Sequence, residues 1–128
     1  MKIIATSIFV ENQDAAKQFY TEKLGFELVN DMDVGGGYRW LTVKEANSSN
    51  PVEVVLEPNA SPIAKNYQEG LFNAGIPVTM FAVDDIEAVQ RDLKDKDVQF
   101  HTEVKEVDQI KMAIFNDTCG NLIQIIEQ

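Results

Sequence analysis

The chain carries one pattern of elements twice, and this internal repeat limits its fold more than any other feature of the sequence. Residues 10–15 (Val-Glu-Asn-Gln-Asp-Ala) align with residues 83–88 (Val-Asp-Asp-Ile-Glu-Ala). In both places a β-rich run ends, an Asn or Asp that can cap a helix follows, and apolar residues then recur at helical spacing. Only the first and last residues of the two segments are identical, but the order of elements around them also matches. We infer an internal duplication.

Each copy is predicted to hold a strand, a helix and three further strands. The expected strands cover residues 2–10, 26–30, 38–44 and 52–57 in the first copy, and 78–83, 98–101, 110–115 and 122–127 in the second. Asn12 and Asp85 are the expected helix caps. Between the copies, Ser61 and Pro62 begin a connecting helix that Gly75 ends. We therefore predict an α+β fold of one domain over residues 1–128, with βαβββ modules at 1–58 and 77–128 and a helical connector at 59–76.

Composition excludes several classes of protein. A net charge of −10 argues against binding to nucleic acid or to anionic membranes, because both require a basic surface. One cysteine and one histidine exclude an internal disulfide framework and a zinc site built from several such residues. No segment is apolar for long enough to span a membrane, and the first residues lack the cleavage site of a signal peptide. We expect a cytoplasmic protein.

Three motifs carry a resemblance to a known superfamily. They are Phe-Tyr-Thr-Glu-Lys-Leu-Gly-Phe at residues 19–26, Phe-Ala-Val-Asp-Asp at 81–85, and Phe-Asn-Asp-Thr-Cys-Gly-Asn-Leu-Ile at 115–123. In this order the chain resembles the vicinal oxygen chelate superfamily of glyoxalase I, bleomycin-resistance proteins, extradiol dioxygenases and fosfomycin-resistance enzymes. The resemblance implies that each module curls its mixed sheet into a cup with its helix on the convex side. The last motif departs from the usual Asp-Pro-x-Gly-Asn and places Cys119 in a turn, where a structural role is favoured over a reactive thiol.

Strand alternation predicts which side chains face the concave side of each cup. Tyr38 and Trp40 can stack a flat or cationic ligand, and Glu57 would add a negative charge and is the one catalytic candidate. In the alternative interpretation, Trp40 fills the core and Glu57 is a solvated strand end. The residues predicted to line one ligand pocket are Ser7, Tyr38, Trp40, Glu57, Val78, Met80 and Gln124.

The superfamily's metal-ligand positions are mostly apolar in this chain. Carried over one by one, they fall on Ala5, on Val55 with Glu53 and Glu57 alongside, on Val78 and on Gln124. A catalytic divalent ion needs about three protein donors. His101 does not fall on a ligand position and is interpreted as a surface or strand-edge residue. We expect no metal and no other cofactor, although a different strand register could bring Glu53, Glu57 or His101 into the site.

These observations predict a metal-independent protein of the glyoxalase/bleomycin-resistance type that binds a small organic ligand, aromatic or cationic, in a concave pocket. The alternative is an enzyme, either a metal-dependent lyase similar to glyoxalase I or a ring-cleaving dioxygenase. A third possibility is a domain that regulates or scaffolds a partner. A homodimer is expected because a cup of four strands leaves open edges and an apolar face. The two modules could pair within the chain or across the dimer.

Overall fold

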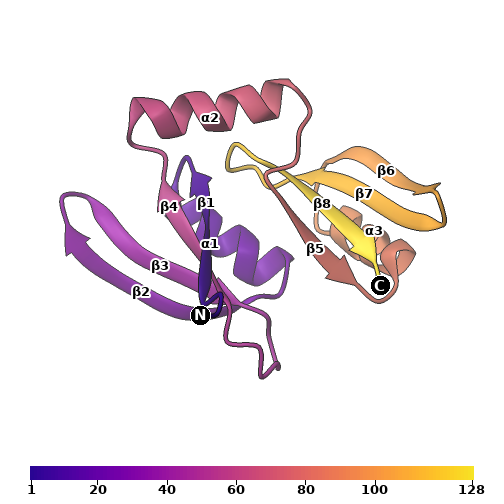
Figure 1. Cartoon of the computed structure of the whole chain (residues 1–128), viewed down its shortest axis with the longest axis horizontal. Helices are drawn as coiled ribbons and strands as arrows, with labels where there is room; N and C mark the ends of the chain where they lie inside the picture. The colour runs from indigo at the N-terminus through magenta and orange to yellow at the C-terminus, as the bar shows by residue number, and fades with distance from the viewer. The chain divides into compact units, whose positions relative to one another are not determined.

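The protein is described by a computed structural model of residues 1–128, with eight strands and three α-helices (Figure 1). It divides into two compact units, Met1–Lys65 and Asn66–Gln128, and each is described by itself. The boundary lies inside the connecting helix α2 (Pro62–Asn73). None of the helices has the length and apolar composition required to cross a bilayer.

The first unit contains one mixed sheet and one helix. Its sheet has the strand order β1-β4-β3-β2, in which β1 is parallel to β4 and the other neighbours are antiparallel. A short π-helix continues the helix and ends before Gly25, whose φ of 78° suits glycine. In chain order the elements are β1 (Ala5–Val10), α1 (Gln13–Gln18), η1 (Phe19–Lys23), β2 (Glu27–Gly35), β3 (Tyr38–Lys44) and β4 (Glu53–Pro58).

The second unit repeats this topology. Its strand order is β5-β8-β7-β6, again with the first strand of the unit parallel to the last. The elements are β5 (Thr79–Val83), α3 (Ile86–Asp95), β6 (Phe100–Val107), β7 (Ile110–Asn116) and β8 (Leu122–Glu127). Two βαβββ modules with mixed sheets confirm the predicted α+β fold.

The helix caps that the repeat predicts are confirmed. The Asn12 side chain accepts a hydrogen bond from the Ala15 N–H at 2.9 Å. The Asp85 side chain accepts from the Ala88 N–H at 3.0 Å. Each cap satisfies one of the N–H groups that the first turn of a helix leaves without a partner.

Some strand limits differ from the prediction. β1 begins at Ala5 instead of residue 2, and β2 continues to Gly35 instead of ending at residue 30. β6 covers Phe100–Val107 instead of residues 98–101. Both β2 and β6 contain register shifts against their neighbours, which interrupt the simple alternation by which a strand is recognised in a sequence.

One face of each sheet is covered by its helix. In the first unit α1 packs on β3 and β4, and in the second α3 packs on β6, β7 and β8. The helix-facing residues of the first sheet, such as Ile8, Leu41 and Leu56, are buried. We call the opposite side of the first sheet its open face, which on β1, β3 and β4 consists of Ala5, Ser7, Phe9, Tyr38, Trp40, Thr42, Lys44, Glu53, Val55 and Glu57.

The ladder between β3 and β4 is short. It joins three residue pairs, from Thr42 with Val55 to Lys44 with Glu53. Residues 38–41 of β3 pair with β2 only, and residues 56–58 of β4 pair with β1 only. The equivalent ladder between β7 and β8 joins five pairs without interruption. The hydrogen-bonded ladder between the two central strands is therefore interrupted in the first sheet and continuous in the second.

Candidate functional site

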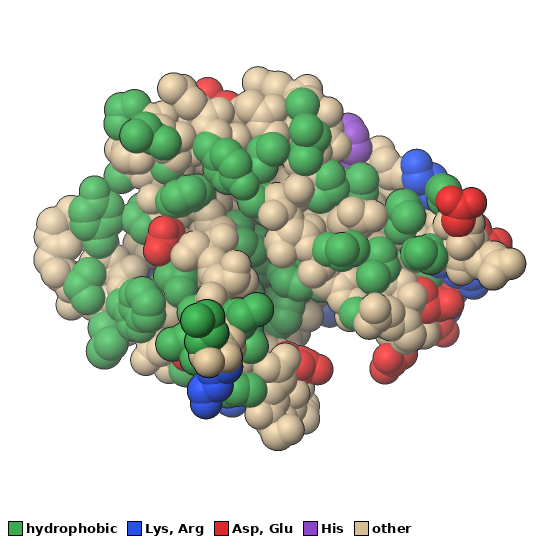
Figure 2. All heavy atoms as spheres, viewed as in Figure 1, with side chains coloured by type: hydrophobic (Ala, Val, Ile, Leu, Met, Phe, Trp, Pro, Cys, Tyr) green, Lys and Arg blue, Asp and Glu red, His purple; other side chains and the backbone are tan.

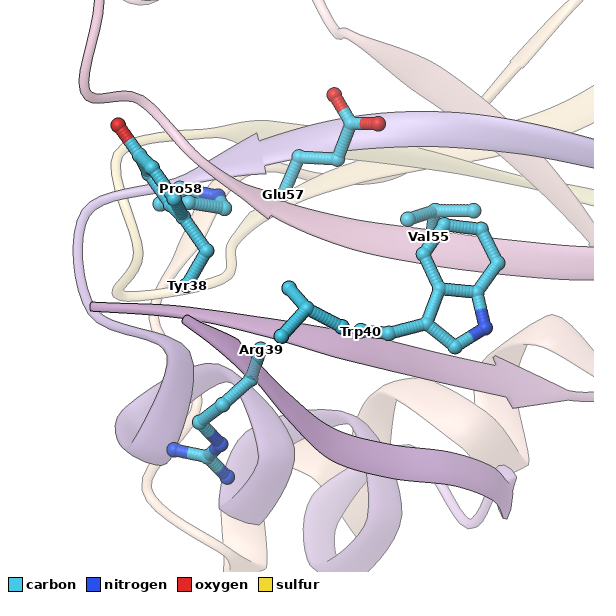
Figure 3. A pocket seen from close by; sticks show the side chains of 7 residues that line it. Tyr38, Arg39, Trp40, Val55, Glu57 and Pro58 are labelled. Atoms are coloured by element: carbon cyan, nitrogen blue, oxygen red, sulfur yellow. The ribbon is translucent and has the colours of Figure 1, made fainter. Parts of the chain in front are cut away.

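A cavity lies where β3 and β4 separate on the open face (Figure 3). Its volume is about 290 Å³, near the lower end of small-molecule pockets. Tyr38, Trp40 and Glu57, all predicted from strand alternation, are among its lining residues. The complete lining is Val34, Tyr38, Arg39, Trp40, Val55, Glu57 and Pro58.

Two aromatic side chains form one wall of this cavity. Tyr38 and Trp40 are two residues apart on β3 and therefore project from the same face of the sheet. Figure 3 shows Tyr38 at the Pro58 end and Trp40 at the Val55 end. Both remain largely accessible, with 45% of Tyr38 and 40% of Trp40 exposed. A flat molecule in the cavity could therefore contact both rings.

Glu57 supplies the charge of the cavity. Its Oε1 accepts a hydrogen bond from the Ser7 hydroxyl on β1 at 3.2 Å, and no cation pairs with it. Arg39 contributes backbone to the lining, but its guanidinium points away from the cavity (Figure 3). The cavity therefore carries one carboxylate without a counter-ion.

The Arg39 side chain is bound on the other side of the sheet. It pairs with Asp31 through two hydrogen bonds, at 2.9 Å and 3.0 Å, and also with Asp14. Lys17 approaches the same Asp31 carboxylate at 2.7 Å. The hydrogen bonds from Arg39, and then from Lys17, hold the pKa of Asp31 well below its usual range. The hydrogen bonds to Asp31 and Asp14 in turn raise the pKa of Arg39.

A second polar group lies on the open face beside the cavity. The Thr42 hydroxyl donates to Glu53 Oε1 at 2.6 Å. The Asn30 amide donates to the Thr42 hydroxyl at 2.9 Å and to Glu53 Oε1 at 3.1 Å. One oxygen of Glu53 is thus held by two donors from β2 and β3. Strand alternation puts Thr42 on the face of Trp40 and Glu53 on the face of Glu57, but no sequence pattern indicates Asn30.

The remaining predicted pocket residues belong to the second unit. Met80 on β5 is more than half exposed and pairs with Gln124 on β8. The Gln124 amide lies 3.5 Å from Met112 Sδ, which is a weak acceptor. Val78 directly precedes β5, and its N–H donates to the Leu122 carbonyl at 2.9 Å. The seven predicted residues therefore fall into two groups: Ser7, Tyr38, Trp40 and Glu57 in the first unit, and Val78, Met80 and Gln124 in the second.

Strand register identifies which residue of β4 stands at the superfamily's metal position. Val55 pairs with Ser7 in the same way that Gln124 pairs with Met80. Glu53 and Glu57 lie two residues to either side of Val55. Carried over from the superfamily, the four positions are then Ala5, Val55, Val78 and Gln124, and only Gln124 has a side-chain atom that could bind a metal. This set does not fit a divalent catalytic ion.

Three carboxylates gather outside the cavity in the second unit. Oxygens of Asp85, Glu87 and Glu127 lie within 4.8 Å of one another. Lys111 donates to Glu87 at 2.9 Å and lies 3.9 Å from Glu127. The hydrogen bond from Lys111 lowers the pKa of Glu87, and the same bond raises the pKa of Lys111. The group is interpreted as a salt bridge that ties α3 to β7 and β8.

Sequence reasoning missed Val34, Arg39 and Pro58 as lining residues. Val34 was missed because β2 was expected to end before it, although Met32 and Val34 alternate with Asp31 and Asp33 and could have extended that strand. Pro58 was placed at the end of its module without a role. The separation of β3 from β4, which creates the cavity, has no direct signal in the sequence.

Comparisons with known proteins agree with this arrangement. A model of the Glyoxalase/Bleomycin resistance protein/Dioxygenase superfamily matches residues 2–125. The uncharacterized protein YurT of Bacillus subtilis (strain 168) is 48% identical over 128 residues, which is 100% of both chains. The crystal structure of UcmS2 superimposes with a TM-score of 0.85 at 32% identity, covering 98% of this chain and 97% of that one. TnmS3, an antibiotic binding protein from Streptomyces sp. CB03234, has a TM-score of 0.77 at 25% identity over 99% of this chain and 95% of its own.

Proposed function

Because the chain belongs to the Glyoxalase/Bleomycin resistance protein/Dioxygenase superfamily, we propose that it binds a flat, cationic organic molecule in the cavity between β3 and β4. The protein holds this ligand without converting it. TnmS3, described as an antibiotic binding protein, supports binding as the activity of this branch of the superfamily.

The combination of Trp40 and Glu57 carries the proposal. An exposed aromatic ring attracts a cation over its face with about 0.5–1 kcal/mol, and with about 2 kcal/mol when the contact is desolvated. An uncompensated carboxylate at the same cavity favours a positive ligand and disfavours a negative one. Tyr38 adds a second ring on the same wall. A neutral aliphatic ligand would use neither feature.

The first test measures binding of ethidium, a flat aromatic cation. Trp40 is the only tryptophan, so quenching of tryptophan fluorescence reports on this one residue of the cavity wall. We expect saturable quenching, and weaker binding of the anionic probe anilinonaphthalene sulfonate. Glu57→Gln should weaken ethidium binding about tenfold, which corresponds to about 1.4 kcal/mol, as measured by ethidium anisotropy.

Glu11→Gln is the matched control, because Glu11 is exposed outside the cavity and its removal changes the net charge equally. Trp40→Leu should also reduce ethidium affinity while the chain stays folded by circular dichroism. Equal ethidium affinities of the Glu57→Gln and Glu11→Gln proteins would contradict the proposal.

We also propose that binding requires no metal. The support is the donor set at the superfamily's metal positions, which offers the Gln124 amide and three hydrocarbon side chains. The lyase and dioxygenase alternatives both depend on such an ion and are therefore not favoured. Elemental analysis after dialysis should find no stoichiometric nickel, zinc, iron or manganese. One equivalent that is retained by the native protein and lost from a Gln124→Ala variant would overturn this expectation.

A symmetric homodimer is the proposed assembly. β1 and β2 are the outer strands of the first sheet, and β5 and β6 those of the second. Apolar side chains gather over the first unit's sheet in Figure 2, and more than half of the surface of both Met32 and Val34 on β2 is exposed. Exposed edges and apolar faces are features that soluble proteins usually cover. A second copy of the chain is the occupant proposed for them.

A further inference from the structure

The side chain of Gln13 lies at the point where β3 and β4 separate. It is 9% exposed, although it sits in the first turn of α1. Its Nε2 donates to the Arg39 carbonyl at 2.8 Å and to the Leu56 carbonyl at 2.9 Å. Its Oε1 accepts from the Arg39 N–H at 3.2 Å. One amide thus binds the backbone of both strands exactly where their own ladder is missing.

Pro58 explains why β4 cannot satisfy the Arg39 carbonyl by itself. If the register of Thr42 with Val55 continued, Arg39 would stand opposite Pro58. A proline has no N–H, so it could not donate to the Arg39 carbonyl. A buried carbonyl without a donor is costly, and the Gln13 amide supplies the missing donor.

The second unit offers an internal comparison. Ile86 occupies the repeat position of Gln13, is fully buried and has no side-chain polar group. There the ladder between β7 and β8 continues through Ala113 with Ile125 and Met112 with Ile126. The unit with a glutamine at this position lacks ladder pairs there, and the unit with an isoleucine keeps them.

The distance between β3 and β4 determines whether an aromatic ring of the ligand can enter the cavity. In a continued ladder Trp40 and Glu57 would stand directly opposite each other. Side chains in such a pair have Cβ atoms about 5 Å apart. A flat ring between two walls needs about 7 Å, which is twice the van der Waals contact distance of about 3.5 Å. An unbroken ladder would therefore fill the cavity with its own side chains.

We propose that Gln13 is a positioning residue that holds β3 and β4 apart and thereby opens the binding cavity between Trp40 and Glu57. The part of this inference that concerns ligand affinity rests on the proposed function. The part that concerns strand separation stands without it. The hydrogen bonds of the Gln13 side chain go to backbone groups, and Gln13 is not itself expected to touch the ligand.

The test is a double variant, Gln13→Ile with Pro58→Val, which installs the residue found in the second unit and restores the N–H opposite Arg39. We expect NMR to show new cross-strand contacts between the backbones of Trp40 and Glu57. The melting temperature should be unchanged or higher, and ethidium affinity should fall at least tenfold. Gln18→Ile is the matched control, since Gln18 lies exposed on the same helix and should change none of these quantities.

A second variant keeps the test informative if the double variant folds poorly. Gln13→Met preserves side-chain length and removes all three hydrogen bonds, and it should lower ethidium affinity with the Trp40 emission shifted. Continued separation of the strands in the folded double variant, or pairing with unchanged ethidium affinity, would overturn the inference. If the native protein fails to bind ethidium, the proposed function fails, and the cross-strand contacts still decide the role of Gln13.

Discussion

Arg39 makes hydrogen bonds in two places, with its backbone atoms at the cavity and with its side chain on the other side of the sheet. Its backbone N–H and carbonyl bind Gln13 at the cavity, and its guanidinium binds Asp31 on the other side of the sheet. Alternation along β3 places the neighbouring Tyr38 and Trp40 at the cavity. A change to the Arg39 side chain therefore probes the charge network behind the sheet and leaves the aromatic wall in place.

This network predicts a specific dependence of stability on pH. The pKa of Asp31 is lower in the folded protein than the value of about 3.9 expected when unfolded, so the folded state binds fewer protons. The resulting stability is fully present above about pH 4 and is lost as the pH falls further. Arg39→Met should therefore reduce the loss of unfolding free energy between about pH 4.5 and 2.5, as measured by urea denaturation.

The other arginine provides the control for this measurement. Arg91 is exposed on α3 and pairs with no carboxylate, so Arg91→Met changes the net charge equally. It should keep the native dependence on pH. Because Lys17 also binds Asp31, some of the dependence should remain in Arg39→Met. Identical profiles for the Arg39→Met and native proteins would contradict the assignment.

At the scale of residues, the sequence predicted the parts of the cavity that follow from one well-recognised strand. β3 has the predicted limits, so alternation correctly placed Tyr38 and Trp40 on one face. Gln13 was beyond such reasoning because its partners are 26 and 43 residues away and are backbone atoms. The one local signal in the sequence was that Gln13 is polar, whereas Ile86, at the equivalent position of the second repeat, is apolar.

At the scale of elements, signals that act over a few residues were reliable. The caps at Asn12 and Asp85 form as predicted because a side chain can satisfy the first turn without help from the rest of the fold. Strand limits were less reliable where β2 and β6 change register. The sequence also left open which residue of β4 matched the metal position, because register depends on the neighbouring strand. In the structure Val55 pairs with Ser7 as Gln124 pairs with Met80, which makes Val55 the repeat equivalent of Gln124.

At the scale of the whole molecule, the proposed homodimer predicts a mass in solution of twice the 14.4 kDa chain. Each chain carries a net charge of −10, so two copies repel each other. Added salt screens this repulsion over a Debye length of about 8 Å at 0.15 M. Light scattering at tens of micromolar should therefore show the dimer, more completely at moderate than at low ionic strength. A single species of chain mass at every salt concentration would refute the proposed assembly.

The unequal ladders of the two repeats also predict how easily each unit opens locally. Local opening is easiest where few bonds cross between elements, and residues 38–41 of β3 have no ladder bond to β4. A ligand that contacts both strands would hold them together at this place. By mass action, its binding should suppress local opening at residues 38–41 and also raise the free energy of global unfolding. The second unit has a continuous ladder, so its conformation should be the same with and without ligand.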